Sequence, residues 1–232
     1  MKTLQHLERL AKKGYKNFLI SGGLGKDLLV PFASHSSTLK RLKLQYDLSY
    51  NFHVGFPQKR LEELEGLADV VSFDFFADPS VMEVVYGFSV DTFRLLEAIS
   101  SSKVPAVPHI TVGILEGRIS HEHRALEILS QNFNCIVLNV FVPTPGTRFA
   151  DFSPPDLSEV RELFEHAKER FKFVALGCMQ PKGHYRWLLQ RAVEPFVDVM
   201  VKPLGRVETN FKGCCAFLLS KISESEVLVH VR

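Results

Sequence analysis

Residues 135–142 read CIVLNVFV, and a segment of helical period follows them at residues 156–170. The apolar side chains of this run stand at consecutive positions, which is typical of a parallel strand covered on both faces. A strand of this kind followed by an amphipathic helix is a βα unit. Six further runs of the same character lie at residues 17–21, 48–55, 69–76, 106–114, 173–176 and 196–201.

The segments between these runs carry helical patterns. Leucines recur at helical spacing in residues 3–13 and 58–67, and Asp156 is a predicted N-cap with Glu159 at capping-box distance. Seven strands with six connections are one unit short of a closed barrel, so we expect an incomplete TIM-type (βα) barrel that lacks its first unit. Further helices are expected at residues 80–86, 90–100, 122–131 and 185–193.

The last part of the chain departs from this repeat. After Lys202 and Pro203 the helical period is lost, and residues 210–219 and 227–231 look like two short strands outside the main repeat. We therefore expect one domain, with a barrel at residues 1–203 and a C-terminal β appendage at residues 204–232.

Composition limits the partners of the protein. The 28 basic and 26 acidic side chains give a net charge of +2 and are scattered along all 232 residues. This distribution argues against nucleic acid and membranes and favours a small-molecule substrate or another protein. No secretory signal and no apolar run of about 20 residues is present, so we expect a cytoplasmic protein.

The four cysteines form no recognisable site in the sequence. Cys135, Cys178, Cys214 and Cys215 include no C-x-x-C pair, and adjacent cysteines bridge only through a strained ring. Cys135 opens an apolar run and is interpreted as a core residue.

Polar residues gather at the predicted strand ends, where the working groups of a parallel barrel meet. His53, Asp74 and His109 could each be a satisfied core residue, but three ionisable groups on neighbouring strands indicate a shared cavity, and we predict them as catalytic. Two imidazoles and a carboxylate also suit zinc or iron, so a metal site stays open, although none is predicted. The segment Ser21-Gly22-Gly23 is either a tight turn that needs glycine torsions or a cradle for an anion.

Five pieces of the chain, in this order and spacing, resemble a biotin-synthase-like branch of the radical S-adenosylmethionine superfamily. The likeness spans about residues 12–203. The pieces are residues 18–23 (FLISGG), 52–55 (FHVG), 108–113 (PHITVG), 143–147 (PTPGT) and 176–181 (LGCMQP).

The resemblance implies S-adenosylmethionine as the cofactor. It implies that the glycine-rich end of the first strand contacts the methionyl amino group of the cofactor and that later strand ends contact its nucleoside. His53, Asp74 and His109 would line the interior of the barrel. Arg186 would meet a substrate carboxylate or phosphate, or is a solvated arginine at a helix start. The residues assigned to the cofactor are Ser21, Gly22, Gly23, Gly113, Glu122, Asn139 and Thr144.

One departure from the family is serious. Its enzymes carry C-x3-C-x2-C just after the first barrel strand, where the thiolates hold a 4Fe-4S cluster that chelates the cofactor. This motif is absent here, and no cysteine set of the chain replaces it. Without a cluster, reductive cleavage of S-adenosylmethionine has no electron source in this chain alone.

Four functions remain open. The leading one is a radical-type barrel, an enzyme only if a missing segment or a cluster-bearing protein partner supplies the cluster; it predicts an open barrel edge at residues 17–21. The second is a degenerate protein that binds S-adenosylmethionine or a nucleoside without radical chemistry. The others are an unrelated TIM-barrel lyase or isomerase with His53 or His109 as acid or base, and a pure interaction protein.

Overall fold

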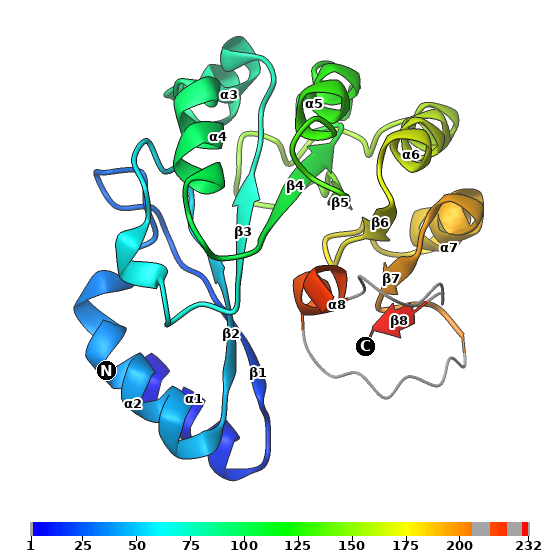
Figure 1. Cartoon of the computed structure of the whole chain (residues 1–232). Helices are drawn as coiled ribbons and strands as arrows, with labels where there is room; N and C mark the ends of the chain where they lie inside the picture. Colours follow the sequence, from blue (N-terminus) through cyan, green and yellow to red (C-terminus); the bar gives the residue numbers. More distant parts are fainter. Residues whose placement is uncertain (1, 206–213, 222–228, 232) are drawn as a thin grey trace.

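The computed structural model describes residues 2–205, 214–221 and 229–231, and their strands form one parallel sheet in chain order. The sheet curls into a half-barrel with helices on its outer side (Figure 1). Among the described residues β1 and β8 pair with one neighbour each and not with one another, so the barrel is open. The expected incomplete TIM-type barrel is therefore confirmed. The strands are β1 (Asn17–Ile20), β2 (Ser49–His53), β3 (Val70–Asp74), β4 (Ala106–Val112), β5 (Cys135–Val140), β6 (Phe173–Leu176), β7 (Val199–Val201) and β8 (Val229–Val231).

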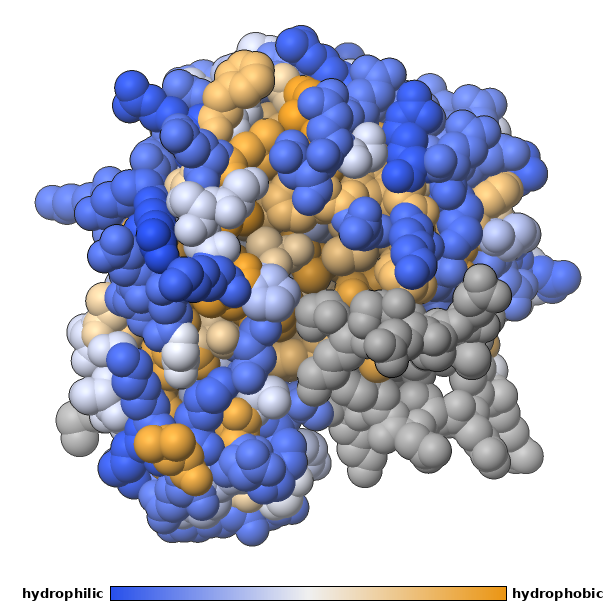
Figure 2. Space-filling view, viewed as in Figure 1, coloured by the Kyte–Doolittle hydropathy of each residue, from blue (hydrophilic) through white to orange (hydrophobic). Residues whose placement is uncertain are grey.

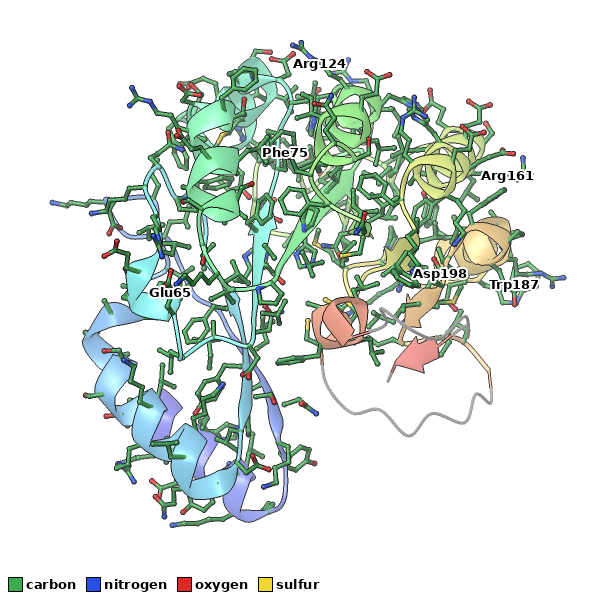
Figure 3. All side chains as sticks on the ribbon, in the orientation of Figure 1. Glu65, Phe75, Arg124, Arg161, Trp187 and Asp198 are labelled. Carbon is green, nitrogen blue, oxygen red and sulfur yellow. The ribbon has the colours of Figure 1, made fainter. Side chains whose placement is uncertain are left out.

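The helices bury one face against the sheet and expose the other. Arg124 and Arg161 project outward, whereas Phe75 points into the interior and is 2% exposed (Figure 3). No helix in the described part of the chain combines the length and apolarity that a membrane crossing requires. The helices are α1 (Lys2–Lys12), η1 (Ala33–His35), α2 (Ser36–Tyr46), η2 (Glu62–Leu64), α3 (Pro79–Tyr86), α4 (Thr92–Ser100), α5 (Glu122–Leu129), α6 (Leu157–Arg170), α7 (His184–Val193), η3 (Glu194–Phe196) and α8 (Cys215–Lys221).

Side chains alternate between the two faces of each strand. Phe73, Ile110 and Leu138 belong to the large core between sheet and helices. Val137 and Ala175, on the other face, belong to a second, smaller core inside the half-barrel. Both faces of the central strands are thus covered, as their consecutive apolar residues predicted.

Helix α8 builds this second core from the inside. It contacts β3, β4, β5 and β6, and its Phe217 is fully buried with Val137 and Ala175. The prediction of a strand at residues 210–219 is wrong, since residues 215–221 are helical; residues 210–213 lie outside the described residues. A short run that is apolar at consecutive positions does not distinguish a buried strand from a buried helix.

The last strand also differs from expectation. The strand predicted at residues 227–231 is present as Val229–Val231, but it pairs in parallel with β7 and continues the main sheet. It therefore does not lie outside the main repeat.

Two further differences concern helices. The helix predicted at residues 58–67 is only the 3-10 turn Glu62–Leu64, and Gly66 adopts a φ of 75° that no α-helix accepts. Leu61, Leu64 and Leu67 are buried all the same, which is why their spacing resembled a helix. Helix α2 was not predicted, because its apolar stripe has only two buried residues, Leu39 and Leu42, and Leu44 adds an apolar residue on its solvent face.

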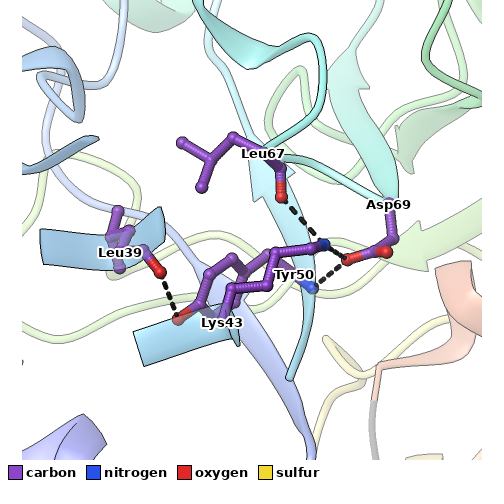
Figure 4. A network of polar contacts seen from close by, with 5 residues as sticks. All are labelled: Leu39, Lys43, Tyr50, Leu67 and Asp69. Atoms are coloured by element: carbon purple, nitrogen blue, oxygen red, sulfur yellow. Dashed lines mark hydrogen bonds and ion pairs between the residues drawn. The ribbon is translucent and has the colours of Figure 1, made fainter. Parts of the chain in front are cut away.

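Two partly buried ion pairs each link a lysine of a helix to the aspartate that directly precedes a strand. Lys43 of α2 pairs with Asp69, which also accepts a hydrogen bond from the Tyr50 backbone nitrogen at 2.6 Å (Figure 4). Lys168 of α6 pairs with Asp198 at 2.7 Å, and Asp198 accepts from the Val174 nitrogen at 2.8 Å. In both units the carboxylate before one strand fixes the first part of the preceding strand.

Replacing Phe217 by Ala removes the largest side chain of α8 from the inner core. Because Phe217 is fully buried, we expect the free energy of unfolding to fall by about 3–5 kcal/mol, measured by urea denaturation. A loss below about 1 kcal/mol would show that α8 does not fill the half-barrel in solution.

Candidate functional site

A cavity of about 470 Å³ opens where β1, β2 and β3 end. Figure 2 shows one face of the molecule, on which hydrophilic side chains cover most of the outer surface and hydrophobic side chains gather near the centre. The lining of the cavity is mixed, which is usual for a small-molecule site. Its residues are Ser21, Gly22, Gly23, Leu24, Val30, His53, Gly55, Phe56, Asp74 and Tyr86.

The loop after β1 is folded back over the end of β2. The Val30 nitrogen donates to the Val54 carbonyl at 3.1 Å, and the Phe56 nitrogen donates to the Leu28 carbonyl at 2.9 Å. Gly55 has a φ of 85°, and a Cβ there would lie 2.5 Å from the Leu28 oxygen. This close approach holds one wall of the cavity in place.

Gly22 and Gly23 do not have the torsions of a tight glycine turn. Neither has a positive φ, and a Cβ on Gly23 would meet nothing within 4 Å. Within the described chain no hydrogen bond from the backbone nitrogen of either residue is found. The backbone here is open toward the cavity, which favours the ligand-cradle alternative over the turn.

The structure brings His53, Asp74 and His109 together beside this cavity. His53 Nε2 lies 3.3 Å from His109 Nδ1 and 3.6 Å from Asp74 Oδ1. Asp74 and His109 are direct register partners on β3 and β4. His109 is 6% exposed, and its Nε2 is buried without a hydrogen-bond partner in the described chain.

The electrostatics of the three groups are coupled. Burial opposes the charge on His53, but hydrogen bonding and attraction from Asp74 and the nearby Cys214 thiolate raise the His53 pKa overall. Burial likewise opposes the Asp74 charge, and His53 and His109 outweigh it and lower the Asp74 pKa. Burial together with repulsion from His53 lowers the His109 pKa to about 3, so His109 is neutral.

A buried polar network that the sequence reasoning missed continues below the three groups. Ser72 Oγ donates to Asn51 Oδ1 at 3.0 Å, and Asn51 Nδ2 donates to Cys214 Sγ at 3.3 Å. A hydrogen bond from Cys215, together with the Ala216 nitrogen, Asn51 and His53, outweighs burial and lowers the Cys214 pKa to about 6. Asn51 stands two residues before His53 on the same strand face, which is the signal that could have found it.

Tyr86 is another cavity residue that the sequence did not single out. It ends α3, and burial together with the charge of Asp74 raises its pKa. Its ring lies 5.3 Å from that of Phe56 and 5.7 Å from that of Phe76.

The other predicted cofactor residues do not line this cavity. Glu122 is fully buried; its Oε1 accepts from the Gly113 nitrogen at 2.8 Å and its Oε2 from the Ser120 nitrogen at 2.6 Å. These bonds fix the loop after β4. Asn139 Oδ1 accepts from the Met179 nitrogen at 3.2 Å, and the exposed Thr144 donates to the Val142 carbonyl at 3.0 Å. Their contact with a nucleoside stays a prediction.

Arg186 lies apart from these groups, on the first turn of α7. Its Nε donates to Gln180 Oε1 at 3.2 Å, and its guanidinium also reaches the Lys202 carbonyl. Its predicted role toward a substrate anion stays a prediction, and these bonds show that it is not simply solvated.

The comparisons with known proteins show the fold. No protein-family model matches the chain, and no curated protein matches it significantly. A similar solved structure is a domain of pyruvate-formate lyase-activating enzyme from Bacteroides vulgatus ATCC 8482, with a TM-score of 0.52 and 12% identity over 73% of this chain and 100% of that one.

The cysteines of the chain do not fit a 4Fe-4S cluster. Cys135 is buried in the inner core, Cys178 is exposed after β6, and Cys215 is the first residue of α8 with Cys214 directly before it. In the described residues the only group of three or more closely placed side chains with metal-ligand chemistry is His53, Asp74 and His109.

The low pKa of Cys214 predicts how its thiol reacts. Alkylation of Cys214 by iodoacetamide, followed by peptide mass spectrometry across pH, should reach half its plateau rate near pH about 6, because the thiolate is the nucleophile. Cys135 is the internal control, since burial raises its pKa to about 12 and should keep it unreactive in the folded protein.

Two variants test the cause of this reactivity. Cys215→Ala removes the strongest hydrogen bond to the Cys214 thiolate and should move the midpoint to higher pH, whereas Cys215→Ser retains a donor and should keep it low. An ordinary thiol midpoint near pH 8.5 in the unmodified protein would contradict the arrangement of Cys214 at the start of α8.

Proposed function

We propose that the chain is a barrel of the radical S-adenosylmethionine type that binds S-adenosylmethionine in the cavity at the ends of β1, β2 and β3. In this proposal the amino-acid end of the cofactor lies against Ser21, Gly22 and Gly23. The observation that carries it is the open glycine backbone facing a cavity of about 470 Å³, within the range of small-molecule pockets.

Two findings support the superfamily. The ordered strand-end pieces resemble it, and the fold is shared with a domain of an activating enzyme from a radical S-adenosylmethionine family. The assignment to the biotin-synthase-like branch rests on the sequence pieces alone. At 12% identity the structural similarity supports the barrel and not the reaction or the substrate.

We further propose that this chain does not cleave the cofactor by itself. Its cysteines do not fit the cluster, so the electron source would be a separate segment or a protein partner. Among the described residues β1 is an edge strand whose one strand partner is β2, and this supports such an association, because a sheet edge is a template for another strand. Leu19 on β1 is 49% exposed beside an apolar groove formed with Leu4, Leu7 and Leu10 of α1.

The cofactor site is tested by anaerobic calorimetry with S-adenosylmethionine and no added iron or sulfide. We expect binding that weakens by about tenfold or more in Gly23→Val, because the added side chain projects into free space at the cradle. The fold should be unaffected for the same reason, and Gly23→Ala is the matched control with a smaller expected loss.

Absence of binding at about 1 mM ligand would remove the cofactor proposal for this chain. Equal affinity in Gly23→Val and the unmodified protein would place the cofactor elsewhere. In either case a melting curve of the variant establishes that it is folded.

The cluster proposal has its own measurement. Anaerobic reconstitution with iron and sulfide should leave no stoichiometric cluster on the isolated chain, judged by bound iron and sulfide after desalting, because no three cysteines of the described residues lie at metal-ligand spacing. A full 4Fe-4S complement that disappears in Cys178→Ser or Cys214→Ser would contradict this and assign the cluster to the chain itself.

A further inference from the structure

We propose that His53, Asp74 and His109 bind one divalent transition-metal ion, zinc or iron, at the wall of the cavity. The proposal goes beyond the cofactor site and does not depend on it. It rests on the convergence of these three side chains and on their charge balance.

The spacing of the ligand atoms suits a metal ion. One donor atom from each residue lies within 4.8 Å of the others. Zinc bound by nitrogen and oxygen at about 2.0–2.2 Å with tetrahedral angles separates its ligand atoms by roughly 3.4 Å. His53 Nε2 lies 3.3 Å from His109 Nδ1 and 3.6 Å from Asp74 Oδ1, close to that separation.

The supporting backbone holds this arrangement. All three side chains come from adjacent parallel strands, and Asp74 and His109 are paired directly in register. Ligands on paired strands keep their separation better than ligands on loops. His53 and Asp74 remain 22% and 28% exposed and line the cavity, so a bound ion could take a further ligand from water or a small molecule there.

The charge balance also favours a cation. Within the described chain the ion pairs include no lysine or arginine with Asp74, whose partner is His53. A partly buried carboxylate is stabilised by a positive charge, and a divalent ion would supply it while both imidazoles stay neutral. His109 is more than nine-tenths buried and presents Nδ1 to His53 Nε2, while its other ring nitrogen, Nε2, has no partner among the described residues, so no hydrogen bond outside the three groups fixes this ring.

The test uses protein freed of any histidine tag and purified without chelator or added S-adenosylmethionine. Bound zinc and iron are measured by inductively coupled plasma mass spectrometry, and the chelator-stripped protein is then titrated with Zn²⁺ or anaerobic Fe²⁺ in a calorimeter. We expect about one ion per chain and micromolar or tighter binding of at least one of the two metals.

Three variants make the result specific. Asp74→Asn and His53→Gln alter partly exposed ligands and should weaken binding by about tenfold or more while leaving the fold intact. His109→Ala should do the same, and because His109 is buried a melting curve first establishes that this variant is folded. His123 and His166 supply the control, because their Nδ1 atoms lie 2.8 Å apart on the exposed outer surface of α5 and α6.

Metal binding that survives His123→Ala/His166→Ala and is lost in Asp74→Asn supports the proposal. Metal that disappears with the outer pair and persists in Asp74→Asn and His53→Gln overturns it. Absence of binding at about 0.1 mM metal also overturns it and leaves the three side chains as a hydrogen-bonded cluster. Since no S-adenosylmethionine is present, failure here does not bear on the proposed cofactor site.

Discussion

The strict alternation of side chains along parallel strands is the constraint on which the rest of this structure depends. Outward-facing residues such as Phe73 and Ile110 pack beneath the helices, and this layer forms the large core. The residues that alternate with these along each strand point into the half-barrel. The sheet therefore has an inner face that other side chains must shield from water, and the chemistry of the protein depends on what packs against each part of this inner face.

Helix α8 covers one part of the inner face, and the polar groups occupy another. The register row that begins with Asp74 and His109 continues through Val137, Ala175 and Val199. The last three lie in the core formed with α8, whereas Asp74 lies beside the cavity. Asn51 and Ser72 lie where the two parts meet, and Asn51 donates to Cys214 at the start of α8.

The sequence predicted the parts of the fold whose pattern is local. All seven expected strands are present because each is a compact apolar run, and Asp156 caps α6 through hydrogen bonds from the Ser158 and Glu159 nitrogens. Helix α8 was wrongly predicted as a strand because its burial inside the half-barrel is decided by tertiary packing. The direct approach of His53 to His109 across β3 was likewise beyond the sequence, which could place them on the second and fourth strands but not establish the register of those strands.

The polar part of the inner row is difficult to explain by folding alone. Valine and alanine fill the same row on β5, β6 and β7 without any buried charge. An aspartate and a histidine in place of such residues carry a desolvation cost; His53 and His109 offset it for Asp74, but His109 stays neutral with its Nε2 buried and unpartnered in the described chain. These polar groups lie at the cavity beside the loop after β1, which the backbone of Gly22 and Gly23 also lines. Because the polar side chains and the open cavity coincide, selection for binding a ligand explains their position better than selection for stability.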